Sequence, residues 1–106
     1  MKNTSLPKGR HVKDKERYSI LVDDLDTCVF CGRPRTDLHE VFFGTAYRQA
    51  AKDWGMVIPV CRECHSYIHR FRPTRLFTQR KAQLIFEEHY GHEKFMEIFK
   101  KNYVGR

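Results

Sequence analysis

CVFC at residues 28–31 and CRECHSYIH at residues 61–69 are the two stretches of this sequence that decide its fold. Each contains one Cys-x-x-Cys pair, so the four thiols belong to Cys28, Cys31, Cys61 and Cys64. Two such pairs facing one ion close a tetrahedral zinc site. Because thiolates fill all four positions, we expect this zinc to be structural and chemically inert. Four buried thiols without metal, or a redox pair, are the alternative interpretations.

The length of the chain predicts one small domain. At 106 residues the hydrophobic core is modest, so metal binding would contribute to the folding free energy. Charged residues make up 31% of the chain and hydrophobic residues 41%, which is typical of a globular protein. No apolar run approaches the ~20 residues that span a bilayer, and the N-terminus has no signal-peptide pattern. We therefore expect a cytoplasmic protein without membrane contact, whose reduced thiols favour metal over disulfides.

The charge of the chain favours a nucleic-acid partner. Lys and Arg total 20 against 13 for Asp and Glu, a net charge of +7. Basic residues gather in the first seventeen positions and again at residues 70–81. We predict a flexible basic arm over residues 1–17 and a zinc-stabilised domain over residues 18–106. A solvated basic surface with a loose tail is the alternative interpretation.

The residue pattern predicts an α+β domain. Short apolar and β-forming runs predict strands, and stretches of helix formers bounded by Gly or Pro predict helices. The helix after Pro73 is amphipathic, because its apolar residues fall near one stripe. We expect strands at residues 18–22, 38–43 and 56–60, and helices at residues 46–54, 62–70, 75–90 and 92–101.

Three histidines lie close to the cysteine pairs. His65 and His69 are four residues apart, which places both imidazoles on one face of a helix. His39 lies in the predicted strand 38–43, and a shared zinc would dock this strand against that helix. We therefore expect the three histidines to hold a second, catalytic divalent cation. One buried structural histidine beside one surface histidine is the alternative interpretation. Glu40 is an acid–base candidate, but neighbours on a regular strand point to opposite faces.

With these residues in place, the arrangement resembles the HNH nucleases of the ββα-metal superfamily. In that family a strand delivers a metal ligand and the general base, a second strand follows, and a helix supplies further ligands. The resemblance covers about residues 18–103 and is more specific to small phage- and prophage-encoded HNH proteins. It rests on LHEVFFGTAYR at residues 38–48, WGMVIPVCRECH at residues 54–65 and AQLIFEEHYGHEKFMEIFKKNYV at residues 82–104.

The resemblance implies a metal-dependent DNA endonuclease with a ββα-metal core, a structural zinc held by four cysteines, and C-terminal helices. By position, His39 matches the metal ligand, Glu40 the general-base slot, and His65 and His69 the helical metal ligands. The catalytic ion would be Mg²⁺, Mn²⁺, Ni²⁺ or Zn²⁺, and a swap of roles between Glu40 and His39 is the alternative. Double-stranded DNA is the expected substrate in the host-cell cytoplasm. Candidates for phosphate contacts are Arg48, Arg62, Arg70 and Arg72.

Two other function classes fit parts of the same pattern. A zinc-ribbon module that binds DNA without cleaving it would keep the cysteines and the charge, and would use the histidines structurally. An accessory protein would bind another phage protein through its helical tail. In that case the docking stripe would be Phe95, Phe99 and Tyr103, although such a stripe is more often part of the core.

Overall fold

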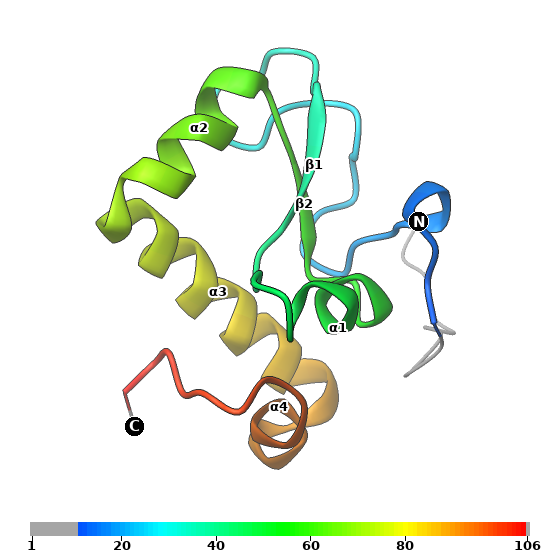
Figure 1. Ribbon diagram of the computed structural model, residues 1–106, viewed down its shortest axis with the longest axis vertical. Coiled ribbons are helices and arrows are strands. Elements are labelled where there is room, and N and C mark those ends of the chain that lie inside the picture. The colour runs from blue at the N-terminus through cyan, green and yellow to red at the C-terminus, as the bar shows by residue number, and fades with distance from the viewer. Residues whose placement is uncertain (1–10, 106) are drawn as a thin grey trace.

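The computed structural model describes residues 11–105 and has an α+β architecture. A two-stranded antiparallel sheet lies at the centre, with helices packed along one side and at one end (Figure 1). A 3-10 turn at Asp14–Glu16 precedes it. The elements are β1 (Asp37–Glu40), α1 (Arg48–Asp53), β2 (Val57–Val60), α2 (Arg62–Arg70), α3 (Arg72–Tyr90) and α4 (His92–Phe99).

The register of the sheet decides where each side chain of β1 points. His39 lies opposite Ile58 and Glu40 lies opposite Val57, in an uninterrupted four-residue ladder. Alternate residues of a strand point to opposite faces. Asp37 and His39 therefore share the face toward α2, and Glu40 points to the other face.

The predicted strand at residues 18–22 is wrong, although this segment does lie beside Gly55, just before β2. The Ile20 N–H donates to the Gly55 carbonyl at 3.0 Å, but no ladder forms. Further along, the Pro59 carbonyl of β2 accepts from the Val29 N–H at 3.0 Å and not from this segment. The Ser19 hydroxyl also accepts from the backbone N–H groups two and three residues later, which replaces strand bonds with a local turn.

The prediction of a flexible arm over residues 1–17 does not hold for its last seven residues. Val12 is buried, and its backbone N–H donates to Asp53 Oδ1 at 2.8 Å. Arg17 forms an ion pair with Glu40 at 2.6 Å. These contacts anchor residues 11–17 against the sheet, and residues 1–10 lie outside the described part of the chain.

The four predicted helices and the other two strands are confirmed; α2 has the predicted bounds, and the other elements have shifted ends. β1 stops at Glu40, three residues before the predicted end; the Val41 N–H still donates to the Met56 carbonyl at 2.9 Å, and the chain bends at residues 41–42. α3 begins at Arg72 rather than residue 75, since Pro73 is tolerated in a first helical turn. α4 ends at Phe99, where Lys100 adopts a left-handed conformation. No helix within residues 11–105 is both long and apolar enough to cross a membrane.

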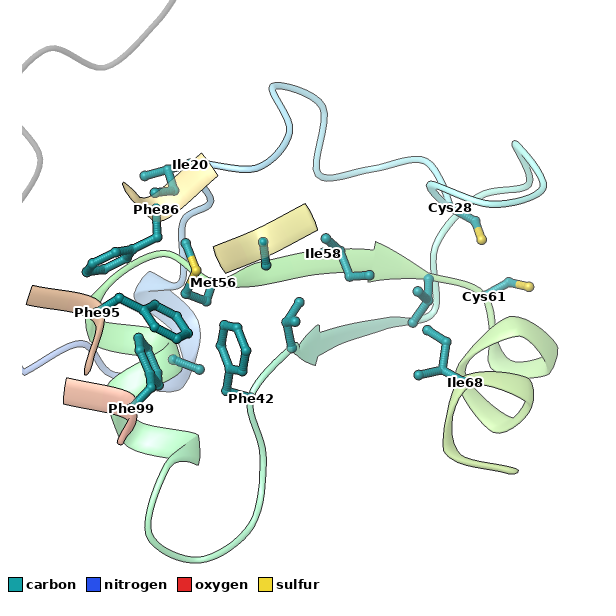
Figure 2. Close-up of a cluster of buried hydrophobic side chains, with 14 residues drawn as sticks. Ile20, Cys28, Phe42, Met56, Ile58, Cys61, Ile68, Phe86, Phe95 and Phe99 are labelled. Atoms are coloured by element: carbon teal, nitrogen blue, oxygen red, sulfur yellow. The ribbon is translucent and has the colours of Figure 1, made fainter. Parts of the chain in front are cut away.

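The core has an aromatic end and a cysteine end (Figure 2). Phe42 packs against Phe95 and Phe99, with ring centroids 5.4 and 4.7 Å apart, and Phe86 joins this cluster. Cys28, Cys61 and Ile68 lie at the other end of the sheet. The proposed docking stripe is therefore wrong: Phe95 and Phe99 are buried core residues, and Tyr103 packs against Phe42.

A substitution at Gly55 tests whether residues 18–22 pack closely against this glycine. Its φ is +72°, and a Cβ there would lie 2.7 Å from Tyr18 Cε2 and 3.1 Å from Ile20. We expect Gly55→Ala to lower the free energy of unfolding by about 3 kcal/mol, measured by urea denaturation. Gly44→Ala is the matched control, because φ is +101° but the added Cβ meets open space, and Gly44 lies outside the cysteine turn. Its expected cost is about 1 kcal/mol, and equal costs at both sites would contradict this packing.

Candidate metal centre

The four cysteine sulfurs form one tight cluster. All four lie within 4.8 Å of one another, and the Sγ atoms of Cys31 and Cys61 are 3.7 Å apart. Thiolates 2.3 Å from a tetrahedral zinc lie about 3.8 Å from each other, whereas disulfide sulfurs lie about 2.05 Å apart. The four thiols are free. This cluster is close enough to hold a metal ion such as zinc, which fits the predicted structural site.

The backbone brings the two cysteine pairs together through β2. The strand runs directly into Cys61, which caps α2 by accepting from the Cys64 N–H at 3.4 Å. The first pair lies in a tight turn that depends on the positive φ of Gly32. A bond from the Val29 N–H to the Pro59 carbonyl, 3.0 Å long, joins this turn to β2. The Cys28 and Cys61 side chains therefore lie at the same end of the sheet (Figure 2).

The cysteine thiols ionise unequally. Burial opposes ionisation of Cys28, but hydrogen bonds from backbone N–H groups lower its pKa to about 6. Burial and the neighbouring sulfurs raise the pKa of Cys64 to about 12. Negative charge on some thiols therefore opposes ionisation of the others, and a divalent cation among them relieves this repulsion.

The three predicted histidines also form one cluster. The ring centroid of His39 lies 5.1 Å from that of His65 and 5.3 Å from that of His69, and the last two are 5.0 Å apart. One ring nitrogen from each lies within 4.8 Å of the other two. Since β1 supplies one ring and α2 supplies two, the cluster spans the junction of sheet and helix. Imidazoles converging in this way suit a divalent cation.

Burial differs strongly among the three rings. The exposed fraction of His39 is only 3%, and burial lowers its pKa to about 3, with smaller contributions from His65 and His69. Burial also lowers the pKa of His69, aided by His65 and by Arg75. His39 is therefore neutral near pH 7 and keeps a nitrogen lone pair for a metal. His69 is exposed, so the cluster is open to solvent on the α2 side.

Asp37 is a site residue that the sequence analysis missed. Its Oδ2 lies 3.1 Å from His65 Nδ1. A carboxylate on one ring nitrogen orients the imidazole and leaves the other nitrogen, Nε2, for a metal. The available signal was the spacing in Asp37-Leu38-His39, because residues two apart on a strand share a face.

The structure separates Glu40 from the histidine cluster. Its carboxylate pairs with Arg17 at 2.6 Å and belongs to the opposite face of β1 from His39. The expectation that Glu40 serves this site is therefore wrong, because the ladder of β1 is uninterrupted and has no bulge to bring both side chains to one place. The exchange of roles between Glu40 and His39 fails for the same reason.

The predicted phosphate-binding arginines are all exposed, but they occupy two places. Arg62 lies on α2 within one turn of His65, and Arg70 and Arg72 lie where α2 meets α3. Arg48 is on α1, a separate helix at the end of the sheet (Figure 1). Arg75 was not among the candidates, yet it donates to the His69 carbonyl at 2.8 Å.

No family model, curated protein or solved structure matches this chain. Within residues 11–105, the α+β fold brings together two clusters of side chains that could hold a metal ion. The first cluster is closed by four sulfurs, and the second has three nitrogen ligands with an exposed side.

Removal of one thiol tests the cysteine cluster. We expect Cys28→Ser to lose tightly bound zinc and its cooperative thermal transition, because metal binding and folding are coupled. Zinc content by atomic emission and melting by circular dichroism measure both. His65→Ala is the control and should keep one zinc per chain, with a Tm within about 5 °C of the parent. A cooperatively folded Cys28→Ser protein with full zinc content would contradict the assignment.

The contact between Asp37 and His65 gives a separate test. Asp37→Asn should weaken binding of a second divalent ion by about 10- to 100-fold, measured by titration calorimetry with Ni²⁺ on the one-zinc protein. Glu40→Gln changes a carboxylate three residues away on the opposite face, and should leave this affinity unchanged. If both substitutions weakened Ni²⁺ binding equally, Asp37 would have no specific role at the histidine cluster.

Proposed function

We propose that this protein is a metal-dependent DNA endonuclease of the HNH type, of the kind carried by phages or prophages. The convergence of the three imidazoles on one point carries the proposal. The order of elements supports it, since β1, β2 and α2 occur as strand, strand and helix, as in a ββα-metal core, with α1 inserted between the two strands. In this account the cysteine cluster holds a structural zinc, and the histidine cluster holds the catalytic ion.

Each residue of the histidine cluster has a distinct part in this proposal. Burial fixes the His39 ring as a neutral ligand on β1. Asp37 orients His65, and the exposed His69 borders the side from which a phosphodiester can approach. A divalent cation held there supplies Lewis-acid stabilisation at a phosphoryl oxygen and a reactive nucleophile from water at neutral pH.

The proposal assigns no general base among the predicted residues. Arg17 holds Glu40 on the other face of the sheet. The low pKa of His39, about 3, suits a metal ligand better than a proton acceptor near pH 7. Activation of water therefore falls to the cation, which can be Mg²⁺, Mn²⁺, Ni²⁺ or Zn²⁺.

Positive charge beside the cluster supports a nucleic-acid substrate. Arg62, Arg70 and Arg72 are exposed, and none of them forms an ion pair with another residue in the described range 11–105. The acid on the exposed side of α2, Glu63, is already paired with Arg33. Contacts from these arginines to phosphates would be salt-dependent and largely independent of sequence.

One observation favours a second candidate, a zinc-ribbon module that binds DNA without cleavage. The residue in the family's general-base slot, Glu40, is committed to Arg17. In that case the histidines stabilise the junction of β1 and α2, and the basic surface retains its role. An accessory protein without DNA affinity is the third candidate.

Plasmid nicking tests the endonuclease directly. We expect the purified protein to relax supercoiled plasmid when Mg²⁺, Mn²⁺, Ni²⁺ or Zn²⁺ is added. His39→Ala and His65→Ala should each reduce the rate by about 100-fold or more, because each removes a ligand of the catalytic ion. Glu40→Gln should stay within about threefold of the parent.

The remaining outcomes separate the alternatives. DNA binding at low salt without nicking under any of the four metals would support the zinc-ribbon module. Absence of DNA affinity at low salt would support the accessory protein. A large loss of nicking in Glu40→Gln, with normal zinc content, would show that Glu40 takes part in the reaction.

A further inference from the structure

An exposed pair of stacked aromatic rings lies at the C-terminal end of α2, on Tyr67 of the helix and on Phe71, the residue that follows it, and the metal clusters do not use it. The ring centroids of Tyr67 and Phe71 are 4.8 Å apart with an interplanar angle of 19°. Their exposed fractions are 44% and 50%. Large aromatic side chains usually bury their area in a core or an interface. A partner with a flat, polarisable face would cover this pair.

The pair occupies the far edge of the exposed side of α2 from the histidines. With 3.6 residues per turn, Tyr67 is about 200° around the helix from His65 and Phe71 lies next to Tyr67. The surface between holds four exposed residues: Arg62, Ser66, Arg70 and Glu63. The exposed side of α2 therefore runs from the histidine cluster, past a cation, to the aromatic pair, over a helix ~10 Å wide.

Charge around the pair selects the kind of partner. Arg70 and Arg72 flank Phe71 in the sequence, and both are exposed and unpaired within the described residues. Glu63 on this side is neutralised by Arg33. Free cations beside exposed rings match a phosphate backbone whose bases can stack, and this combination recurs in proteins that bind single strands.

We propose that Tyr67 and Phe71 form a stacking platform for an unpaired nucleobase. The substrate class is then nucleic acid with single-stranded or extruded bases, such as a gap, flap or branch, rather than fully paired duplex. The inference deepens the proposed function, because the strand held on the platform continues over α2 toward the histidine cluster. The phosphates contact Arg70 and Arg72 along this path.

Binding of matched oligonucleotides tests the platform without cleavage. The probes are a fluorescein-labelled single strand, an abasic strand of the same length and charge, and a blunt duplex, measured by anisotropy on the zinc-loaded protein without a second metal. We expect the protein to bind the base-bearing strand at least about fivefold more tightly than the abasic strand. Tyr67→Ala and Phe71→Ala should each remove most of this preference and leave blunt-duplex affinity within about twofold.

Three variants serve as controls. Phe77→Ala removes another ring, 58% exposed but on α3, and should leave the preference intact. Phe71→Trp keeps a stacking surface and should retain it. Arg70→Gln should weaken all three probes and lower the salt slope by about 0.7 to 0.9.

Two results would overturn the platform. One is equal affinity of the parent protein for base-bearing and abasic strands. The other is a preference unchanged in Tyr67→Ala and Phe71→Ala, which would leave the rings as a protein-docking surface. The platform and the endonuclease can fail separately. If the binding test rejects the platform, nicking that is lost in His65→Ala but normal in Tyr67→Ala would still support the endonuclease. A preference for base-bearing strands in a protein that nicks no plasmid would support the platform and reject the endonuclease.

Discussion

The cysteine cluster is the constraint on which the rest of this structure depends. It joins two stretches that are distant in the sequence: the turn at residues 28–31, and the junction where β2 ends and α2 begins. The sheet between them has only two four-residue strands, which alone give little stability. Four thiols this close also repel as they ionise, so a cation that gathers them stabilises the fold and fixes the position of α2.

The position of α2 in turn determines the geometry of the histidine cluster. β1 presents His39 at a fixed register opposite Ile58, and α2 begins immediately after the cysteine that ends β2. A shift of one residue in that register would exchange His39 for Leu38 or Glu40 at the cluster. The aromatic end of the core, around Phe42 and Phe99, packs α3 and α4 against the sheet and belongs to the same buried cluster as Cys28 and Cys61 (Figure 2).

The sequence was most informative where chemistry and spacing coincide. The bounds of α2 match their prediction because Cys61 caps the helix, and Phe71 ends it before Pro73. Residues 18–22 were misassigned because an apolar run carries no information about local side-chain bonds, and here the Ser19 hydroxyl accepts from the backbone N–H groups of Leu21 and Val22. The pairing of Glu40 with Arg17, and the burial of Val12, depend on long-range contacts that no local pattern encodes. Strand alternation could have placed Asp37 on the same face as His39. Its role follows only from its contact with His65, which the sequence does not show.

X-ray absorption at the zinc K-edge, on protein loaded with a single equivalent of zinc, tests the central claim most directly. The account predicts a first shell of four sulfur atoms at about 2.3 Å, because the ion that orders β2 and α2 binds the four thiolates. A shell containing two or more nitrogen atoms at about 2.0 Å would place the tightest zinc at the histidines. In that case the cysteines would not be the element that holds the fold together.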